Sequence, residues 1–405
     1  MARQPRHFRQ AVVLSAALAT TALAAACGGG SRGPSDSAVT GQLSARCAPE
    51  SLTTQLTSTL GAIHSRNRVP GISAAIFVPE VMAAPIAVAV GASALSGGHP
   101  LEAGDRFLAG SIGKTFFAAL ALRRSAEGTF SLDAPLATLI AGARIPAFAW
   151  ITPRMLLTHL SGVGEYDGPF MTALVRDPLR IRRPEDWLGV IRRNPPQRDS
   201  AGTFRYSDLN YVLLAMALDA REPGGVYRAI ELAYLRPLGL TGTVPSTTPR
   251  IAGLVGGYEG PASMFGRDAM LEGDTLIYNP QFEWGGGGFA STPRDLARWM
   301  VAIRRGEAFP DSLWPAVVAR PAGLADSARH WRGIGIHVDS GALGTTFGHS
   351  GYMPGYVSWM RWVEAIGISV AIQANATDSA RLPDDGFDWA DSIAVAVAAR
   401  CQLPL

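Results

Sequence analysis

Apolar residues recur along the chain at two spacings, which predict helices and strands in turn. Over 52–63 they lie three or four residues apart, as on one face of a helix. The short apolar runs at 72–78 and 86–90 are predicted to be strands, and together they indicate a hairpin. A second helical stretch is predicted over 107–126, ending at Gly128.

Two later helices carry a start signal. Thr152-Pro153 and Thr292-Pro293 each place a hydroxyl residue, a good N-cap, before a proline at the first helical position. Strands and helices at both ends of the chain, with a mostly helical middle, predict an α/β fold. One lobe would be built from both termini, with a helical lobe inserted. The predicted C-terminal elements are strands at 333–338, 355–362 and 366–374 and a helix at 389–399.

The first 26 residues are predicted to be an export signal. Three arginines between positions 3 and 9 precede an apolar stretch over 11–26, which is too short to span a membrane. Small residues then precede Cys27, an arrangement that resembles a bacterial lipoprotein signal. The resemblance implies cleavage before Cys27 and a lipid on its thiol. The mature protein would then be membrane-anchored, in the periplasm or at the cell surface. Plain secretion with cleavage nearby is the alternative.

Glycine, proline and serine after Cys27 predict a flexible tether over 27–46, followed by one folded domain over 47–405. Cys47 and Cys401 stand at the two ends of that domain. In an oxidising compartment this placement favours a disulfide between them, since domain termini often lie close together. Two buried free thiols are the alternative.

The composition and charge give no sign of a nucleic-acid partner or of a cofactor. The chain has 405 residues, of which 47% are hydrophobic and 17% charged, as in ordinary globular proteins. Its net charge of +3 equals the three arginines of the export signal. The balance of the remaining charges argues against nucleic acid. The cysteines and histidines show no metal-ligand spacing, and no metal or organic cofactor is predicted. Nothing in the sequence indicates an oligomeric state.

Ser111 and Lys114 form an S-x-x-K motif, and Lys114 is the only lysine in the chain. Residues three apart share one face of a helix, so the lysine can reach the serine hydroxyl. Serine is a poor nucleophile until a base takes its proton, which a desolvated lysine can do and arginine cannot. A surface lysine on an amphipathic helix is the alternative.

Further motifs follow in a fixed order. With S-x-x-K they resemble those of the β-lactamase-related serine hydrolases, which include class C β-lactamases, D-alanyl-D-alanine carboxypeptidases, D-amino-acid peptidases and esterases. The resemblance covers about 52–399 and implies an antiparallel sheet flanked by helices, with an inserted, mostly helical lobe. The motifs are Ser111-Ile112-Gly113-Lys114, Tyr206-Ser207-Asp208 and His349-Ser350-Gly351, supported by stretches at 156–162, 236–240 and 287–292.

The resemblance also implies a role for each motif residue. Ser111 would attack a carbonyl carbon and form an acyl-enzyme, with Lys114 as a charge or proton shuttle beside it. Tyr206 would be the general base, which requires positive charge from Lys114 or His349 to lower its pKa. The backbone N–H groups of Ser111 and Tyr352 would form the oxyanion hole. Ser350 would hydrogen-bond the substrate, and Gly351 would let the strand approach it.

Asp208 departs from the family pattern, which has asparagine there. An ionised aspartate only accepts hydrogen bonds, and it would keep Lys114 charged and disfavour a tyrosinate. Asn210 lies one helical turn beyond Tyr206 and is an alternative source of the amide. His159 is interpreted as structural.

Several other residues have two readings. Tyr166 and Trp284 are either pocket walls or core, and Glu283 is either a pocket residue or a solvated loop charge. The four histidines without a partner pattern are interpreted as surface or packing residues, namely His64, His99, His330 and His337.

The leading hypothesis is an extracytoplasmic serine hydrolase acting on a D-alanyl-type peptide or amide, or on a small ester. His349 in place of the lysine of K-T-G resembles the D-alanyl peptidases, so a dedicated β-lactamase ranks lower. A non-catalytic, penicillin-binding-like sensor or scaffold is an alternative from another class, and Asp208 is its only support.

Overall fold

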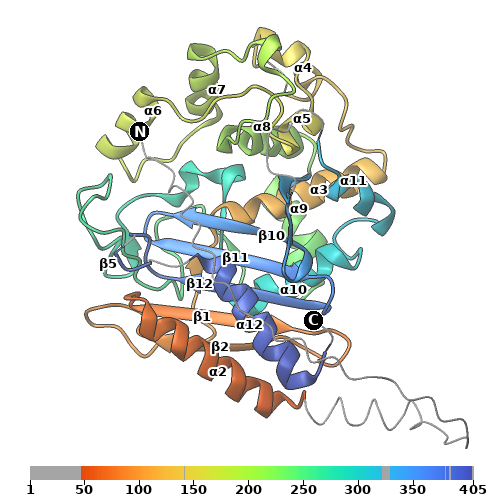
Figure 1. Cartoon of the computed structure of the whole chain (residues 1–405). Coiled ribbons are helices and arrows are strands. Elements are labelled where there is room, and N and C mark those ends of the chain that lie inside the picture. Colours follow the sequence, from red (N-terminus) through yellow and green to blue (C-terminus); the bar gives the residue numbers. More distant parts are fainter. Residues whose placement is uncertain (1–46, 141, 322–328, 379, 383–384, 404–405) are drawn as a thin grey trace, which may run out of the picture. The chain divides into compact units, whose positions relative to one another are not determined.

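The computed structural model describes residues 47–140, 142–321, 329–378, 380–382 and 385–403 (Figure 1). The predicted export signal, the lipid on Cys27 and the tether over 27–46 lie outside the described residues. No helix in the described part of the chain is both long enough and apolar enough to cross a membrane.

A seven-stranded antiparallel sheet is the centre of the fold, in the order β2-β1-β12-β11-β10-β9-β8. The hairpin predicted near the N-terminus is present as β1 paired with β2. On its other side β1 pairs with β12, so residues from both ends of the domain meet in mid-sheet. The strands are β1 (Gly71–Phe77), β2 (Ile86–Gly91), β8 (His330–Arg332), β9 (His337–Gly341), β10 (Gly344–Met353), β11 (Tyr356–Val363) and β12 (Ile368–Ala374).

Helices cover both faces of this sheet. Every residue of β1 and β12 is buried, which requires packing on both sides. Helices α2 (Pro49–Arg66) and α12 (Gly386–Cys401) pack together in front of the strands in Figure 1, and α10 (Pro293–Arg304) lies behind them. The apolar spacing over 52–63 correctly predicts α2, whose buried residues are those four apolar positions.

The segment between β2 and β8 is mostly helical, as predicted. Thr152 caps α5 by accepting a hydrogen bond from the backbone N–H of Met155, and Thr292 caps α10 in the same way. The helices of this segment, besides α10, are α3 (Lys114–Ala126), α4 (Leu136–Leu139), α5 (Pro153–Leu157), α6 (Gly168–Arg176), α7 (Pro184–Arg193), α8 (Asp208–Asp219), α9 (Val226–Ile230) and α11 (Trp314–Val318).

Small sheets complete the structure. Strand β7 (Phe289–Ser291) lies between β3 (Phe107–Leu108) and β4 (Val244–Pro245), and β5 (Leu271–Glu272) pairs with β6 (Thr275–Leu276). The sequence prediction of a strand at 333–338 is wrong over 333–336, where the chain turns between β8 and β9 and Gly335 adopts a left-handed conformation with φ 66°. Its last two residues, 337–338, belong to β9.

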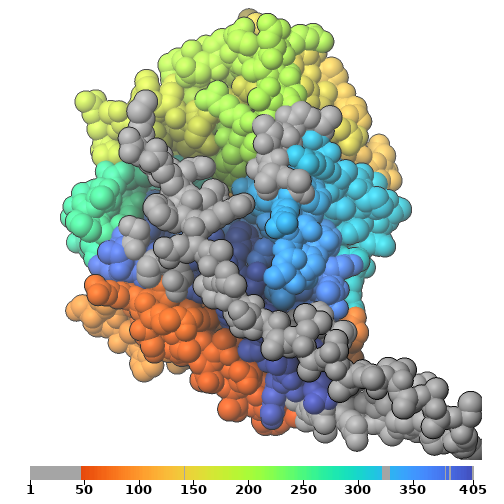
Figure 2. All heavy atoms as spheres, viewed as in Figure 1, coloured from red at the N-terminus to blue at the C-terminus, as the bar shows by residue number. Residues whose placement is uncertain are grey.

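Cys47 and Cys401 form a disulfide that joins the start of the described domain to the end of α12. Both cysteines are buried beside the packed pair of α2 and α12. Figure 2 shows the orange surface of the N-terminal elements adjoining the dark blue surface of the C-terminal helix. The disulfide therefore closes nearly the whole domain into one covalent loop, with a sequence separation of 354 residues.

We predict that replacing both cysteines by serine lowers the free energy of unfolding by about 2–5 kcal/mol, because the cross-link restricts the unfolded chain. Urea denaturation of the oxidised parent and the double variant, each with and without dithiothreitol, measures this. The parent should fall to the level of the variant when reduced, whereas the variant should not respond. A parent whose unfolding midpoint ignores dithiothreitol would contradict the prediction.

Candidate active site

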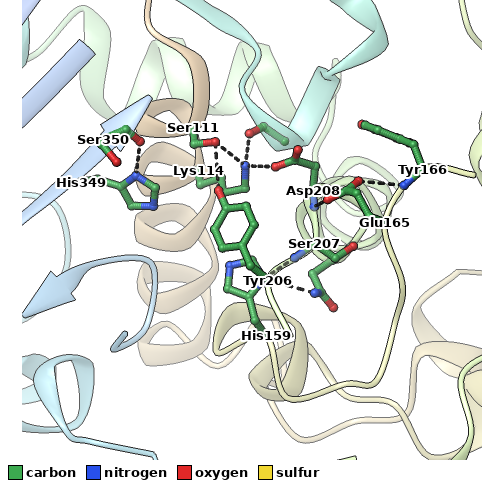
Figure 3. Close-up of polar contacts among 12 residues, drawn as sticks. Ser111, Lys114, His159, Glu165, Tyr166, Tyr206, Ser207, Asp208, His349 and Ser350 are labelled. Atoms are coloured by element: carbon green, nitrogen blue, oxygen red, sulfur yellow. Dashed lines mark hydrogen bonds and ion pairs between the residues drawn. The ribbon is translucent and has the colours of Figure 1, made fainter. Parts of the chain in front are cut away.

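Ser111 lies in a 3₁₀ turn, η1 (Gly110–Gly113), directly before helix α3. The predicted single helix over 107–126 is wrong at its start, because Phe107–Leu108 pairs with β7 as a strand. Lys114 is the first residue of α3, and its Nζ donates a hydrogen bond to Ser111 Oγ over 3.0 Å. The S-x-x-K spacing thus brings the two side chains together (Figure 3).

Lys114 is fully buried, with 0% of its surface exposed, which rules out the alternative of a surface lysine. Its ammonium group donates to Ser111 Oγ, to the carboxylate of Asp208 and to the carbonyl oxygen of Gly286, so each of its three protons has an acceptor. Burial alone would lower the pKa of Lys114, but the facing acidic groups, Asp208 first and then Tyr206 and Glu283, together raise it above its ordinary value. The lysine is therefore positively charged in the resting protein.

Tyr206 donates a hydrogen bond from its hydroxyl to Ser111 Oγ over 2.9 Å. Lys114 Nζ lies 5.1 Å from the centroid of its ring. Burial raises the pKa of Tyr206, and the charge of Lys114 opposes that shift without cancelling it. The tyrosine is therefore a neutral phenol at neutral pH, and Ser111 Oγ accepts one hydrogen bond from each neighbour.

His159 supports Tyr206 from below, with the ring centroids 4.4 Å apart and the planes nearly parallel. Its Nδ1 faces the backbone N–H of Ser207 at 3.3 Å and the side-chain amide of Asn210 at 3.2 Å. Burial, followed by the charge of Lys114, lowers the pKa of His159 well below its usual range. The ring is thus a neutral acceptor that holds other residues, and Asn210 is committed to it rather than replacing Asp208.

Strand β10 approaches η1 so closely that only glycine fits at two positions. A Cβ added at Gly351 would lie 3.1 Å from the nitrogen of Ser111, and one at Gly110 would lie 2.5 Å from the nitrogen of Tyr352. The two N–H groups predicted for the oxyanion hole are therefore on facing segments. The Tyr352 side chain is half exposed, and its hydroxyl donates to Glu259 over 2.7 Å.

His349 lies on the opposite side of Ser111 from Asp208 (Figure 3). Its Nδ1 donates to the backbone carbonyl of Ser350 over 2.6 Å, and its ring packs against His337 with centroids 4.2 Å apart. Burial and then the charge of Lys114 lower the pKa of His349 to about 3. The expectation that His349 could supply positive charge to Tyr206 is wrong, because the imidazole is neutral.

Two further carboxyl groups lie beside Asp208. Glu165 accepts the backbone N–H of Asp208 over 2.9 Å and that of Tyr166 over 2.9 Å. Burial and the charge of Asp208 raise the pKa of Glu165 to about 7. Glu283 is only 9% exposed, so the reading of a solvated loop charge is wrong. Burial and Asp208 raise the pKa of Glu283 well above its ordinary value.

Tyr166 and Trp284, which the sequence left as either pocket wall or core, both belong to packed aromatic clusters. Tyr166 stacks on Phe170, with centroids 4.6 Å apart, and its hydroxyl donates to the carbonyl of Phe282 over 3.4 Å. Trp284 stacks on Trp187 at 5.5 Å. Both keep partly exposed surface as well as packing inward. Tyr166 lies next to Glu165 in Figure 3, and Trp284 directly follows Glu283 in the chain.

A family model described as Beta-lactamase matches residues 53–394. The chain belongs to the beta-lactamase family. A D-stereospecific amidohydrolase from Streptomyces sp. superposes with a TM-score of 0.68 at 25% identity, covering 87% of this chain and 99% of that one. The D-amino acid amidase of Ochrobactrum anthropi SV3, in complex with L-phenylalanine amide, gives a TM-score of 0.71 at 22% identity, over 87% and 99% of the two chains.

Among curated proteins, the Unguisins hydrolase ungD' of Aspergillus campestris (strain IBT 28561) is 25% identical over 283 residues. That match covers 59% of this chain and 48% of the relative, so the chain spans about half the length of the curated relative. The antiparallel sheet with flanking helices and an inserted helical segment is the β-lactamase/transpeptidase-like fold that the sequence predicts.

In this beta-lactamase-family protein, the hydroxyl of Ser111 can exchange its proton with Tyr206 or Lys114. No other titratable side chain in the described part of the chain hydrogen-bonds to it. Because both partners hold their own protons at rest, one of them must lose a proton before it can accept another. The described residues contain no group of three or more side chains suited to hold a metal ion.

Sequence reasoning missed Glu165. It adjoins Tyr166, which the sequence did single out, but a glutamate in a loop carries no pattern of its own. Its importance comes from the start of α8, where its carboxylate accepts the first backbone N–H of the helix. That contact joins residues 43 positions apart, which periodicity cannot reveal.

The raised pKa of Glu165 predicts that the stability of the protein depends on pH. Its pKa in the folded protein is about 7, raised from an ordinary 4.5, so the folded state holds this proton more tightly than the unfolded state. Stability is therefore lost as pH rises from the lower value to the higher. Relative to Glu165→Gln, the free energy of unfolding of the parent should therefore fall across that interval. Urea melts at intervals of half a pH unit measure the difference, and parallel curves would contradict it.

Proposed function

We propose that this protein is an extracytoplasmic, lipid-anchored serine hydrolase that works through an acyl-enzyme on Ser111. The observation that carries the proposal is the double hydrogen bond to Ser111 Oγ, from Lys114 Nζ at 3.0 Å and from Tyr206 at 2.9 Å. A partly exposed serine contacted by two proton-exchanging groups is typical of an activated nucleophile. The export signal and the lipid on Cys27 rest on the sequence pattern alone.

The reaction would proceed in two acyl transfers. The pair of Tyr206 and Lys114 first gives up one proton to solvent, and then takes the proton of Ser111 as Oγ bonds to the substrate carbonyl carbon. The N–H groups of Ser111 and Tyr352 would stabilise the oxyanion. The pair returns the proton to the leaving amine or alcohol as its bond to carbon breaks. Water then cleaves the acyl ester by the same proton route and regenerates Ser111.

The preferred substrate is an amide or short peptide of a D-amino acid with a free amino group. Asp208 shares Lys114 with Ser111, and Glu165 contacts the backbone of Asp208, so this side of the site favours a cation. The likeness to a D-stereospecific amidohydrolase and a D-amino acid amidase supports the same class. D-Alanyl peptides and small esters are further candidates, since an acyl-enzyme can be formed from each.

Hydrolysis of D-alanine amide and D-phenylalanine amide tests the proposal, with the L-amides as matched controls. The D-amides should be cleaved faster. Ser111→Ala should lose activity by at least about 10³-fold, because the nucleophile is gone. Intact mass spectrometry should find an acyl adduct on the parent with p-nitrophenyl acetate or a penicillin, and none on Ser111→Ala. An adduct on the alanine variant would contradict the assignment of the nucleophile, and rapid turnover of the penicillin would favour a β-lactamase.

Asp208→Asn tests whether Asp208 keeps Lys114 and Tyr206 protonated in the free enzyme. Asp208 raises the pKa of both Lys114 and Tyr206, so its removal lets the pair lose a proton more easily. Since the pair must lose a proton, kcat/KM should rise with increasing pH. We expect this rise to occur about one pH unit or more lower in Asp208→Asn. A pH–rate profile over pH 6–10 measures the shift, with Asp133→Asn at an exposed ion pair as control. An unmoved profile would show that Asp208 does not set the proton affinity of the pair.

A further inference from the structure

Glu283 is a buried carboxyl group to which the proposed reaction gives no part. It lies at the junction of two 3₁₀ turns, η5 (Pro280–Phe282) and η6 (Trp284–Gly286), and is nine-tenths buried. Its side chain makes no hydrogen bond or ion pair with any described residue, whereas its backbone takes part in both turns. An ionised carboxylate in such a place is strongly disfavoured, so a carboxylic acid that keeps its proton is the stable form.

Its neighbours connect it to the nucleophile. A Cβ added at Gly286 would lie 2.6 Å from Glu283 Oε2 and 3.1 Å from Asp208 Cβ, so the two acidic side chains flank one glycine. The carbonyl oxygen of the same glycine accepts a hydrogen bond from Lys114. Glu165 contacts Asp208 from the other side, through the backbone N–H of the aspartate.

Three carboxyl groups therefore lie near one ammonium group, which contacts Asp208 directly. Were all three ionised, the cluster of Asp208, Glu165, Glu283 and Lys114 would carry two uncompensated negative charges, one of them on the buried Glu283. The other titratable groups that face Glu283 are the phenols of Tyr166, Tyr227 and Tyr278, which burial keeps neutral. His159 and His349 face Lys114 as neutral rings, and the charge of Arg332 acts on those two histidines.

We propose that Glu283 is a positioning residue for cationic substrates, holding a proton in the free enzyme and releasing it when a substrate ammonium group binds beside Asp208. Asp208 is the member that meets the substrate, since its side chain is 21% exposed. The arriving ammonium supplies the missing positive charge, so the carboxylic acid of Glu283 ionises and its proton passes to solvent. No carbon bond changes: one ammonium enters and one proton leaves. This inference rests on the proposed preference for amine-bearing substrates.

The proton exchange makes the site prefer a cationic substrate over a neutral or an anionic one. A neutral amide of the same shape brings no charge, so Glu283 keeps its proton and the substrate gains no electrostatic attraction. A substrate with a carboxylate in the same place would meet Asp208 directly and be repelled. The cluster therefore recognises the charge of the substrate, independently of the residues that contact its reacting carbonyl.

Calorimetric titration of the full mature chain carrying Ser111→Ala with D-alanine amide tests the proposal without turnover. At pH 6.5 the ligand is fully cationic, since an α-amine has a pKa of about 8. Binding heats in phosphate and in Tris, whose ionisation enthalpies differ, give the number of protons released. We expect about one proton per ligand. Propionamide, which lacks only the amino group, should release none.

Single substitutions added to Ser111→Ala assign the proton to its residue. Glu283→Gln keeps the shape of the protonated acid and should reduce the release to near zero, whereas Glu283→Asp should retain it. Glu165→Gln should also retain most of the release. A release that persists in Glu283→Gln, or binding of D-alanine amide by the parent without any release, would overturn the inference. No binding of the amide at all would instead contradict the proposed substrate class, and the inference with it.

Discussion

The rest of the site depends on the burial of one ammonium group. Lys114 has no exposed surface and gives its three protons to Ser111, Asp208 and the carbonyl of Gly286. Each contact comes from a different part of the chain, namely η1, the start of α8 and η6. A buried charge without such partners would destabilise the fold by several kcal/mol, on the order of the penalty for an unpaired ion. The lysine thus requires the sheet-side and helix-side segments to meet at the nucleophile.

The site is asymmetric in charge across the nucleophile. One side carries Asp208 and Glu165, and the other carries the neutral ring of His349 (Figure 3). This charge difference would orient a substrate that has a cationic end, since that end is attracted to one side only. In the proposed function, substrate selection and activation of Ser111 would therefore share a residue, Asp208.

The sequence predicted the parts of this structure that depend on local pattern. The spacing over 52–63 gives α2, the threonine–proline pairs give α5 and α10, and the motif order gives the family and the fold. Patterns were insufficient where a residue's state depends on distant neighbours. His349 is neutral and Glu283 is buried because of packing by segments far away in sequence.

Strand β10 was only partly predictable from the sequence. Its sequence, from Gly344 to Met353, mixes glycines with polar residues and shows no simple alternation, so only the motif at His349 indicates a strand there. The prediction failed in the opposite way at the turn between β8 and β9. The apolar residues there suggest a strand, but the backbone turns at Gly335. The spacing of apolar residues reflects which positions are buried. It gives a wrong or incomplete prediction where a glycine allows two backbone segments to approach closely or allows a turn.

The pairing of β1 with β12 has a consequence for how the domain is made. Ile72 pairs with Ala374 and Phe77 with Ser369, so the middle of the sheet joins residues about 300 positions apart. During synthesis the N-terminal hairpin emerges early, yet it has no central partner until β12 follows. Until then one edge of β1, and the apolar faces that α10 and α12 will cover, stay open to other chains. The central sheet therefore cannot be completed before β12 has been made, so folding of the domain has to wait until synthesis is nearly complete.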